Sequence, residues 1–292
     1  MSDKIFRIAS LTCSYNRKDK TVAFLRSLLS QPLPPQYTLD VYLLDDNSSD
    51  GTAEAVKANF PSVKLIHGNG SLFWAGGMRK VWGEALKGDY DFYALFNDDV
   101  KLDDHALSKL LAAYKLAGSE GHIILGAVKD FNKDKLTYGG RTVTNWRNGN
   151  SDSVIPDETR LQAAELGNAN IMLVDQKTVK TIGILSESYT HGLADFDYTL
   201  TAVKNGIKVW VAPGYYGHCE YDHGKPWLSG KAPLKKRINY LYSPTGLAYK
   251  EYVVFLRRHF PRCVTDKVFK LWLKTLLPVV YEKFKKTEQD EV

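Results

Sequence analysis

Cysteine is scarce in this sequence, since the 292 residues contain only Cys13, Cys219 and Cys263. Their wide separation matches no metal-binding spacing, and an odd number argues against a framework of disulfide bonds. We therefore expect a protein of the reducing cytoplasm. Long apolar runs are also missing, because no uninterrupted stretch reaches the roughly 18 residues of a membrane-spanning helix. The first residues lack the cationic region and apolar run of a signal peptide.

What is present is ordinary for a soluble globular protein, with 44% hydrophobic and 25% charged residues. The length suits one large α/β domain, or one domain with a helical appendage. Charge is unevenly placed: residues 231–286 contain fourteen Lys and Arg but three acidic residues, a net charge of +11, whereas the whole chain carries +6. The first 230 residues are therefore near neutral or slightly acidic, and the C-terminal fifth is strongly basic.

Strand-like and helix-like patterns alternate at short spacing along the first hundred residues. Apolar, β-rich runs lead into turn residues and then into segments with apolar residues at helical spacing. The expected strands cover 5–13, 39–44, 63–66 and 91–96, and the expected helices cover 18–31, 52–59 and 78–86. This alternation predicts a doubly wound, mostly parallel α/β sheet with helices on both faces.

The second half of the chain continues this pattern less regularly. Gly, Asn, Ser and Thr are common in 136–156, which predicts a β-hairpin or loop there. Periodicity predicts helices at 103–117, 175–182, 195–205, 249–260 and 268–284, and strands at 123–128, 165–174 and 207–212.

Polar clusters occur where the first four expected strands end. The clusters are Ser14-Tyr15-Asn16, Asp45-Asp46-Asn47-Ser48, the glycine-rich stretch Gly68–Arg79, and Asn97-Asp98-Asp99. The carboxyl ends of parallel strands meet at one edge of a sheet, where open α/β proteins bind their ligands. We therefore expect all four clusters to line one crevice.

Asp98 and Asp99 are adjacent carboxylates at the end of the apolar run Ala94–Val100. Because neighbouring carboxylates repel each other and are costly to bury, the pair needs a counter-charge. A divalent ion that also holds a diphosphate is one solution, since Mg²⁺ and Mn²⁺ prefer oxygen ligands. The alternative is a solvated turn in which one of the two caps the next helix.

These motifs resemble those of family 2 inverting glycosyltransferases with the GT-A fold. Asp45–Thr52 is similar to their nucleotide-binding motif, and Asn97-Asp98-Asp99 is similar to their metal motif. With Ser14–Arg17 and a later acidic motif, the resemblance covers roughly residues 5–220. It implies an enzyme that moves a sugar from a nucleoside diphosphate to an acceptor hydroxyl, like rhamnosyltransferase-like members that build bacterial surface polysaccharides.

The resemblance implies that Asp46 accepts a hydrogen bond from the base, with Asp45 and Ser48 supporting that loop. A carboxylate suits the imide N–H of uracil or thymine, so we expect a UDP- or dTDP-sugar. The alternative for Asp46 is an ordinary Asx turn. Ser14, Tyr15 and Asn16 are expected to line the same nucleotide site.

In the metal motif, the resemblance implies that Asp99 holds Mg²⁺ or Mn²⁺ and that Asp98 touches the ribose or a metal-bound water. Asn97 replaces the acidic residue that the family usually has first. His218, after the last clear strand, is implied to complete the metal site or to touch the pyrophosphate.

The glycine-rich stretch is expected to hold the donor sugar. Gly76 and Gly77 allow the backbone to approach a ligand closely, and free N–H groups at the start of the following helix favour a phosphate or sugar oxygen. Trp74 is a candidate for stacking on a pyranose, and Arg79 for binding the diphosphate. Alternatively, Phe73 and Trp74 anchor the loop in the hydrophobic core.

The resemblance implies that Asp195 is the catalytic base, because displacement with inversion needs a carboxylate to take the acceptor proton. The family pattern Glu-Asp-x-Asp has Ala194 in place of its Glu but keeps Asp195 and Asp197. The alternative makes Asp195 a helix N-cap, with Asp197 in the first turn. Asn168 is expected to bond the sugar or diphosphate from the acceptor side.

We therefore predict a GT-A catalytic domain at 1–230, with a nucleotide-binding half at 1–100 and an acceptor half at 101–230. A basic helical extension follows at 231–292. Its charge suits an anionic membrane surface or a lipid-linked glycan acceptor, so we expect a cytoplasmic protein with peripheral membrane contact. The alternative is a solvated basic face, and nucleic acid is not an expected partner because no recognition motif accompanies the charge.

Two other functions stay open at this stage. A nucleotidyltransferase on a related sheet would carry a glycine- and basic-rich loop after the first strand, and Ser14–Arg17 lacks one. A sugar-nucleotide or glycan-binding module without turnover is the second, which Asn97 and Ala194 keep open.

Overall fold

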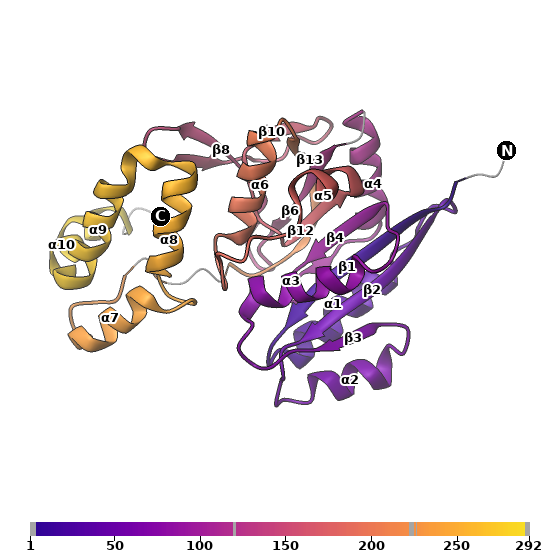
Figure 1. The fold of residues 1–292 in the computed structure, drawn as a ribbon, viewed down its shortest axis with the longest axis horizontal. Coiled ribbons are helices and arrows are strands. Elements are labelled where there is room, and N and C mark those ends of the chain that lie inside the picture. The colour runs from indigo at the N-terminus through magenta and orange to yellow at the C-terminus, as the bar shows by residue number, and fades with distance from the viewer. Residues whose placement is uncertain (1–3, 119–120, 222–224, 226, 290–292) are drawn as a thin grey trace.

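The computed structural model of the protein describes residues 4–118, 121–221, 225 and 227–289. Its centre is one large sheet with helices on both faces (Figure 1). The main strands, in their order across the sheet, are β10 (Gln162–Ala164), β13 (Lys208–His218), β6 (His122–Lys129), β12 (Ile171–Asp175), β4 (Phe92–Phe96), β1 (Phe6–Ser14), β2 (Tyr37–Asp45) and β3 (Lys64–His67). Two short strands join its margin: β5 (Lys101–Leu102) pairs with β13, and β7 (Leu136–Tyr138) pairs with β6.

The N-terminal half of the sheet is parallel, as the alternation of patterns predicted. β1 pairs in parallel with both β2 and β4, and β2 pairs in parallel with β3. The second half is mixed, because β12 runs antiparallel between β4 and β6, while β13 is again parallel to β6. The carboxyl ends of β1, β2 and β4 therefore lie at the same edge, with Ser14 directly beside Asp45 in the ladder.

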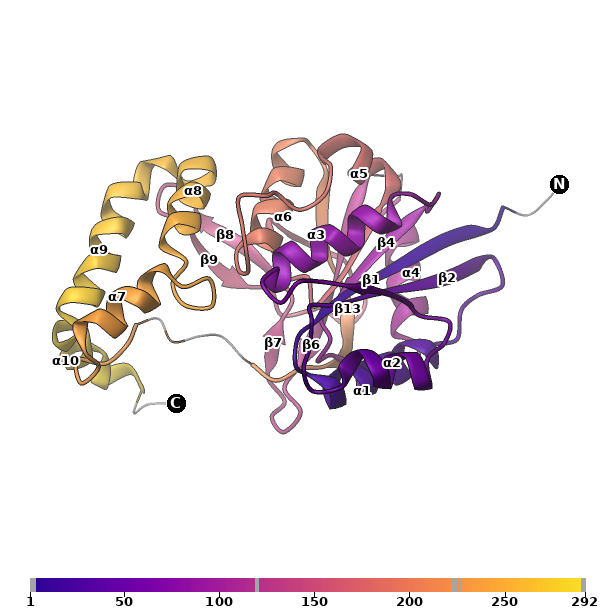
Figure 2. The same ribbon diagram turned by 60° about the horizontal axis from the view of Figure 1, so that its bottom comes forward.

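Two separate hydrophobic cores lie on the two faces of the sheet. Each is covered by helices, which Figure 2 shows on both sides of the sheet. The helices of one face are α3 (Phe73–Ala85), α5 (Gln176–Ile182) and α6 (Ala194–Lys204), and those of the other are α1 (Lys18–Leu29), α2 (Thr52–Asn59) and α4 (Ala106–Leu116). Successive residues of β4 alternate between the cores, since Leu95 belongs to the first core and Ala94 and Phe96 to the second. A strand buried on both faces explains the continuous apolar run in the sequence.

Several expected boundaries were wrong. The expected strand 165–174 is two strands in different sheets, because Asn168–Asn170 interrupts it between β11 (Leu166–Gly167) and β12. The helix expected to begin at residue 78 begins at Phe73, so both Gly76 and Gly77 lie inside it. Gly77 is required by packing: a Cβ there would lie 2.1 Å from the Cys13 sulfur on β1. The last strand continues beyond residue 212 to His218.

The C-terminal helices lie together at one end of the molecule, far from the N-terminus (Figure 1). They are α7 (Leu234–Tyr242), α8 (Tyr249–His259), the 3-10 helix η1 (Pro261–Cys263), α9 (Val264–Leu276) and α10 (Pro278–Gln289). A small sheet of β11, β8 (Gly140–Asn145) and β9 (Asn150–Ser153) lies between them and the main sheet. Within the described residues, no helix combines the length and apolar character needed to cross a bilayer. The domain boundary at 230/231 stays a prediction; it falls between β13 and α7.

Candidate active site

The loops that follow β1 and β2 are bonded to each other at the carboxyl edge of the sheet. The backbone N–H of Asn16 donates to Ser48 Oγ at 2.8 Å, and the Asn16 side-chain oxygen accepts from the Ser49 N–H at 2.7 Å. Asn16 has a positive φ of 52°, a conformation that asparagine tolerates better than most residues. Two of the four expected clusters therefore form one surface, on which the Tyr15 side chain is exposed.

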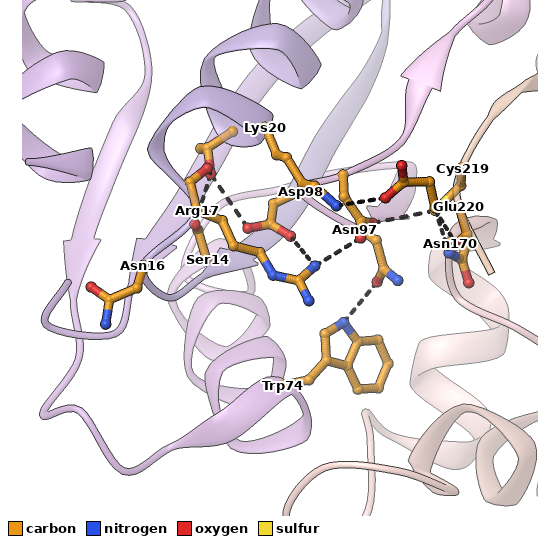
Figure 3. Close-up of polar contacts among 12 residues, drawn as sticks. Ser14, Asn16, Arg17, Lys20, Trp74, Asn97, Asp98, Asn170, Cys219 and Glu220 are labelled. Carbon is orange, nitrogen blue, oxygen red and sulfur yellow. Dashed lines mark hydrogen bonds and ion pairs between the residues drawn. The ribbon is translucent and has the colours of Figure 1, made fainter. Parts of the chain in front are cut away.

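Arg17 is the counter-charge of the acidic pair at the end of β4 (Figure 3). Its Nη1 donates to Asp99 Oδ2 at 2.7 Å and lies 3.5 Å from Asp98 Oδ1. The two carboxylates are nearly buried, with 7% and 9% of their side chains exposed, whereas the Arg17 side chain is 39% exposed. Neither aspartate caps a helix, because the N-cap of α4 is His105. A cation therefore already occupies the position where the sequence predicted a positive charge.

Asp98 is the more deeply held member of the pair. Thr21 Oγ1, from α1, donates to Asp98 Oδ2 at 3.3 Å and lies 2.7 Å from Ser14 Oγ. Burial raises the pKa of Asp98 to about 6, although the Arg17 charge and a Ser14 hydrogen bond act in the opposite direction. Ser14 is itself buried, so it supports Asp98 from beneath.

The acidic pair fits a divalent ion only in part. Asp98 and Asp99 offer adjacent hard oxygen ligands, which suits Mg²⁺ or Mn²⁺ bound through one or two carboxylates together with substrate phosphates. Across the described parts of the chain, however, no group of three or more His, Cys, Asp or Glu side chains converges as a complete metal site. The residues therefore fit an ion that arrives with a diphosphate, and such an ion would compete with Arg17 for the Asp99 carboxylate.

Asp46 holds the glycine-rich loop. Its Oδ1 accepts from the backbone N–H groups of Asn69 and Gly70 at 3.1 and 2.9 Å, and its Oδ2 accepts from those of Leu72 and Phe73 at 2.8 and 3.3 Å. A carboxylate has about four lone-pair positions, so these bonds nearly saturate it. This differs from the expected contact with a base, for which Asp46 would have to give up a loop bond.

Asp45 differs from its neighbour in having an unused acceptor. Its Oδ2 accepts from the Ser48 N–H at 3.2 Å, which is the supporting role expected for both residues. Its Oδ1 is buried and has no hydrogen-bond partner among the described residues. A buried oxygen without a donor is costly, so this atom is one where a donor group of a ligand would be stabilised.

Trp74 connects the glycine-rich loop to the end of β4. Its indole N–H donates to Asn97 Oδ1 at 2.9 Å, and its ring packs partly buried against the first core (Figure 3). The side-chain oxygen of Asn97 therefore accepts a hydrogen bond from the loop and is not directed to a metal ion. The alternative in which Trp74 anchors the loop accounts for these contacts, and stacking on a sugar stays a prediction.

Arg79 is directed to the segment before α6. Its Nη1 donates to the carbonyl oxygens of Ser186 and Tyr189 at 2.9 and 2.7 Å. This nitrogen therefore binds backbone carbonyl groups, which differs from the expected contact of Arg79 with a diphosphate. Instead, Arg79 ties α3 to the chain that leads into the helix carrying Asp195.

Asp195 lies in the first turn of α6, one residue after the helix begins. Its Oδ2 accepts from Asn168 Nδ2 at 3.4 Å and from the Ala169 N–H at 3.3 Å, and its Oδ1 accepts from its neighbour's N–H, Phe196, at 2.9 Å. Burial raises the pKa of Asp195, and these hydrogen bonds offset that effect only in part. Leu193 is the N-cap, so the alternative of a capping Asp195 is wrong.

The segment Asn168–Asn170 joins Asp195 to the acidic pair. While its first two residues bond Asp195, the Asn170 carbonyl accepts from the Asn97 N–H at 3.3 Å, and Asn170 Nδ2 lies 3.7 Å from Cys219 Sγ. Cys219 Sγ in turn lies 3.5 Å from Asp99 Oδ1. Three consecutive residues therefore contact the candidate base on one side and the end of β4 on the other.

Two of the predicted site residues have other partners. Asp197 is buried and bonded to Tyr189, Arg258 and His259, which leaves no exposed surface for a substrate. His218 Nδ1 lies 3.2 Å from Asp103 Oδ1, and it is the next residue, Cys219, that reaches Asp99. His218 is the last residue of β13, and Cys219 is the first residue after it, so the end of the strand places the cysteine, not the histidine, beside Asp99.

Sequence reasoning missed Arg17, Thr21 and Cys219 as members of the site. Arg17 follows Asn16 in a cluster that was already singled out, so the need of Asp98 and Asp99 for a counter-charge was a usable signal for it. Thr21 lies four residues after Arg17, the N-cap of α1, which is about one helical turn. Helix geometry therefore places the two side chains on the same side of α1. Nothing in the sequence pointed to Cys219.

The fold and the acidic edge define a nucleotide-diphospho-sugar-transferase type of α/β protein, the GT-A class. A family model described as glycosyl transferase family 2 matches residues 11–166, more than half of the chain, and the protein therefore belongs to this family of glycosyltransferases. No curated protein sequence matches the chain.

Solved structures with similar folds include glycosyltransferases of low sequence identity. The mannosyltransferase PcManGT from Pyrobaculum calidifontis, in complex with GDP-Man and Mn²⁺, is 14% identical with a TM-score of 0.56, covering 94% of this chain and 70% of that one. Residues 1–349 of S. aureus TarS with UDP-GlcNAc are 16% identical with a TM-score of 0.55, covering 93% and 80%. GalNAc-T7 with UDP, GalNAc and Mn²⁺ is 11% identical with a TM-score of 0.55, covering 94% of this chain and only 58% of that one.

Proposed function

We propose that this glycosyltransferase moves a sugar with inversion from a UDP- or dTDP-sugar to a hydroxyl of a glycan or glycolipid, in the assembly of a bacterial surface polysaccharide. The observation that carries the proposal is the segment Asn168–Asn170, which joins Asp195 to the acidic end of β4. A base and a diphosphate-binding edge on either side of one short segment suit a single displacement. The complexes of PcManGT with GDP-Man and of TarS with UDP-GlcNAc support a nucleotide-sugar donor.

The nucleotide is proposed to lie over the linked loops of β1 and β2. Asn16 and Ser48 shape this surface, and Asp45 supports it by accepting from the Ser48 N–H. Asp46 acts on the nucleotide through the loop that it holds. The base preference for uracil or thymine rests on the family resemblance.

In the transfer step, the acceptor hydroxyl attacks the anomeric carbon from the side opposite the diphosphate. The new C–O bond forms as the bond to the diphosphate oxygen breaks, and Asp195 takes the hydroxyl proton. Asn168 and the Ala169 N–H orient that carboxylate. Asp99, with Asp98 beside it, would hold Mg²⁺ or Mn²⁺, which when bound would supply positive charge for the departing diphosphate. Arg17 contributes a second positive charge at the same edge.

The test mixes the protein with a panel of UDP- and dTDP-sugars, with and without Mn²⁺ or Mg²⁺. The two measurements are the melting temperature of the protein and the release of the nucleoside diphosphate. A bound donor raises the apparent melting temperature by mass action. We expect one donor to stabilise the protein in a metal-dependent manner and to turn over, and Asp195→Asn to bind it without turnover. The exposed Asp104→Asn is the matched control for the charge change. Tight donor binding with no turnover on any acceptor or on water would favour the binding-module alternative.

We further propose that the protein is cytoplasmic and meets the membrane through α9 and α10. The segment of α9 and α10 has exposed apolar side chains within the basic C-terminal part of the sequence: Phe269, Leu276, Leu277, Val279 and Val280. Apolar residues beside positive charge suit the boundary of an anionic bilayer, where a lipid-linked acceptor would be found. Co-sedimentation with vesicles that contain anionic lipid, and loss of this binding in Phe269→Ser, test the idea. Equal binding to neutral vesicles would contradict the electrostatic part.

A further inference from the structure

Asp197 is a buried carboxylate, outside the acidic edge, that is bonded to side chains from both α8 and the segment before α6. Its side chain is 3% exposed and accepts from Arg258 Nη1 at 2.9 Å on each oxygen. His259 Nε2 lies 2.7 Å from Oδ1, and Tyr189 Oη donates to the same oxygen at 2.8 Å. We call Asp197, Arg258, His259 and Tyr189 the Asp197 cluster. It joins the first turn of α6 to the last turn of α8, in the C-terminal extension.

These contacts also decide the charge of Asp197. Burial alone would raise its pKa, but the hydrogen bonds from His259 and Tyr189 and the charge of Arg258 outweigh burial and lower it. The carboxylate is therefore ionised at neutral pH and stays paired with α8. Removing one partner of such a pair leaves a buried charge without compensation.

The candidate base depends on the position of α6 more than on its own bonds. The two bonds that orient Asp195 from outside its helix are long, at 3.4 and 3.3 Å, whereas the bonds of Asp197 on the same helical turn are between 2.7 and 2.9 Å. The position of Asp195 therefore follows the position of α6, because in the described part of the chain no short hydrogen bond from outside this helix holds the carboxylate in place.

The chain that leads into α6 is held by α8 as well. Thr190 N–H donates to Glu251 Oε2 of α8 at 3.0 Å, while the Thr190 carbonyl accepts from the Ala75 N–H of α3 at 3.1 Å. Arg258 Nη1 also reaches Ser186 Oγ at 3.3 Å. This chain segment is thus fixed between the helix of the glycine-rich loop and the C-terminal extension.

We propose that Arg258 and His259 are positioning residues that hold α6, and with it Asp195, in the orientation needed for transfer. The C-terminal extension is then part of the catalytic apparatus, in addition to any contact with a membrane. This inference rests on the proposed function, since it concerns the base of that reaction. It goes beyond it by assigning catalytic consequences to residues that touch neither donor nor acceptor.

The test compares Arg258→Ala with Arg257→Ala in the full-length protein, using kcat, KM for the donor and melting temperature. Arg257 is the neighbouring exposed arginine of the same helix and is the matched control. We expect Arg258→Ala to lower kcat by about 100-fold, the scale of a base displaced by about 1 Å, with the donor KM changed by less than about threefold. Arg258→Lys, which keeps the charge but loses the two-oxygen contact, should recover part of kcat. Arg257→Ala should match the unaltered protein.

A kcat within about twofold of the unaltered protein in Arg258→Ala, despite a lower melting temperature, would overturn the inference and leave a purely structural ion pair. If Arg258→Ala does not fold, Asp197→Asn replaces it, because the amide keeps the shape and some hydrogen bonds; a normal kcat in that variant overturns the inference equally. Asp195→Asn separates the two proposals. Full turnover in Asp195→Asn refutes the proposed function, whereas loss there with normal kcat in Arg258→Ala refutes only the positioning role.

Discussion

Replacing Asp46 by asparagine exchanges one carboxylate oxygen for an amide nitrogen that cannot accept a hydrogen bond. Each Asp46 oxygen accepts two backbone N–H groups of the loop 69–73, so either orientation of the new amide leaves two of them without an acceptor. The site is 2% exposed, and water cannot readily replace the lost oxygen. The loop also packs closely around the carboxylate, because a Cβ on Gly68 would lie 2.2 Å from Asp46 Oδ1.

The expected cost follows from these two orphaned donors. A buried N–H without a partner costs about 1–3 kcal/mol, so Asp46→Asn should lower the free energy of unfolding by about 2–6 kcal/mol. For a protein of this size, that corresponds to a fall in melting temperature of roughly 5–15 °C. Nucleotide affinity should fall as well. The loop that Asp46 holds leads into Trp74, which donates to Asn97 at the proposed donor site, so a disordered loop would disturb that site.

Urea denaturation followed by tryptophan fluorescence, and calorimetric binding of UDP and dTDP, would measure both effects. Asp104→Asn makes the same change of charge at an exposed position and should stay within about 0.5 kcal/mol of the unaltered protein. If Asp46→Asn is as stable as this control and loses only nucleotide affinity, the loop bonds are dispensable. Asp46 would then act as a direct base contact, as the family resemblance implies.

Three further predictions concern the acidic edge, the base and the packing of α3. Because Arg17 pairs with Asp98 and Asp99, Arg17→Ala should be less stable without metal yet gain more melting temperature from Mn²⁺ than the unaltered protein does; an equal Mn²⁺ shift would contradict competition for Asp99. Burial raises the pKa of Asp195, and a base must be ionised to take a proton. We therefore expect kcat to fall as the pH drops through a pKa higher than that of an ordinary aspartate. A kcat that stays constant down to pH 4 would argue against Asp195 as the base. Gly77→Ala should cost about 1–3 kcal/mol, because its Cβ would meet Cys13 Sγ at 2.1 Å, whereas Gly83→Ala, which has open space, should stabilise the same helix by about 0.5–1 kcal/mol; equal effects in denaturation would refute this account of Gly77.

The location of the site was predictable because it follows from local patterns. Continuous apolar runs mark strands buried on both faces, and the polar residues that end β1, β2 and β4 have to meet at one edge of a parallel sheet. The need of Asp98 and Asp99 for a counter-charge was equally local. The early start of α3 was not predicted, and α3 packs on β1 through a close contact between Gly77 and Cys13, which are 64 positions apart.

The roles of single residues were harder to predict, because they depend on which group from a distant part of the chain contacts each residue in the folded protein. Asp46 and Asp45 have the same chemistry, but the glycine-rich loop folds onto Asp46 and leaves Asp45 Oδ1 without a donor. His218 and Cys219 are neighbours, but His218 lies beside Asp103 and only Cys219, just after the end of β13, reaches Asp99. Family motifs carry the residue type but not these contacts.

By itself, the sequence determined the class of fold, the edge of the sheet where the polar residues gather, and the candidate base, since each of these depends on short-range periodicity or on a contiguous motif. Only the tertiary structure decided that Arg17 neutralises Asp99, 82 residues away, and that Asp197 pairs with Arg258, 61 residues away. Such pairs are chosen by the packing of whole helices and strands. That packing is set by many contacts together, so no single segment of the chain contains it.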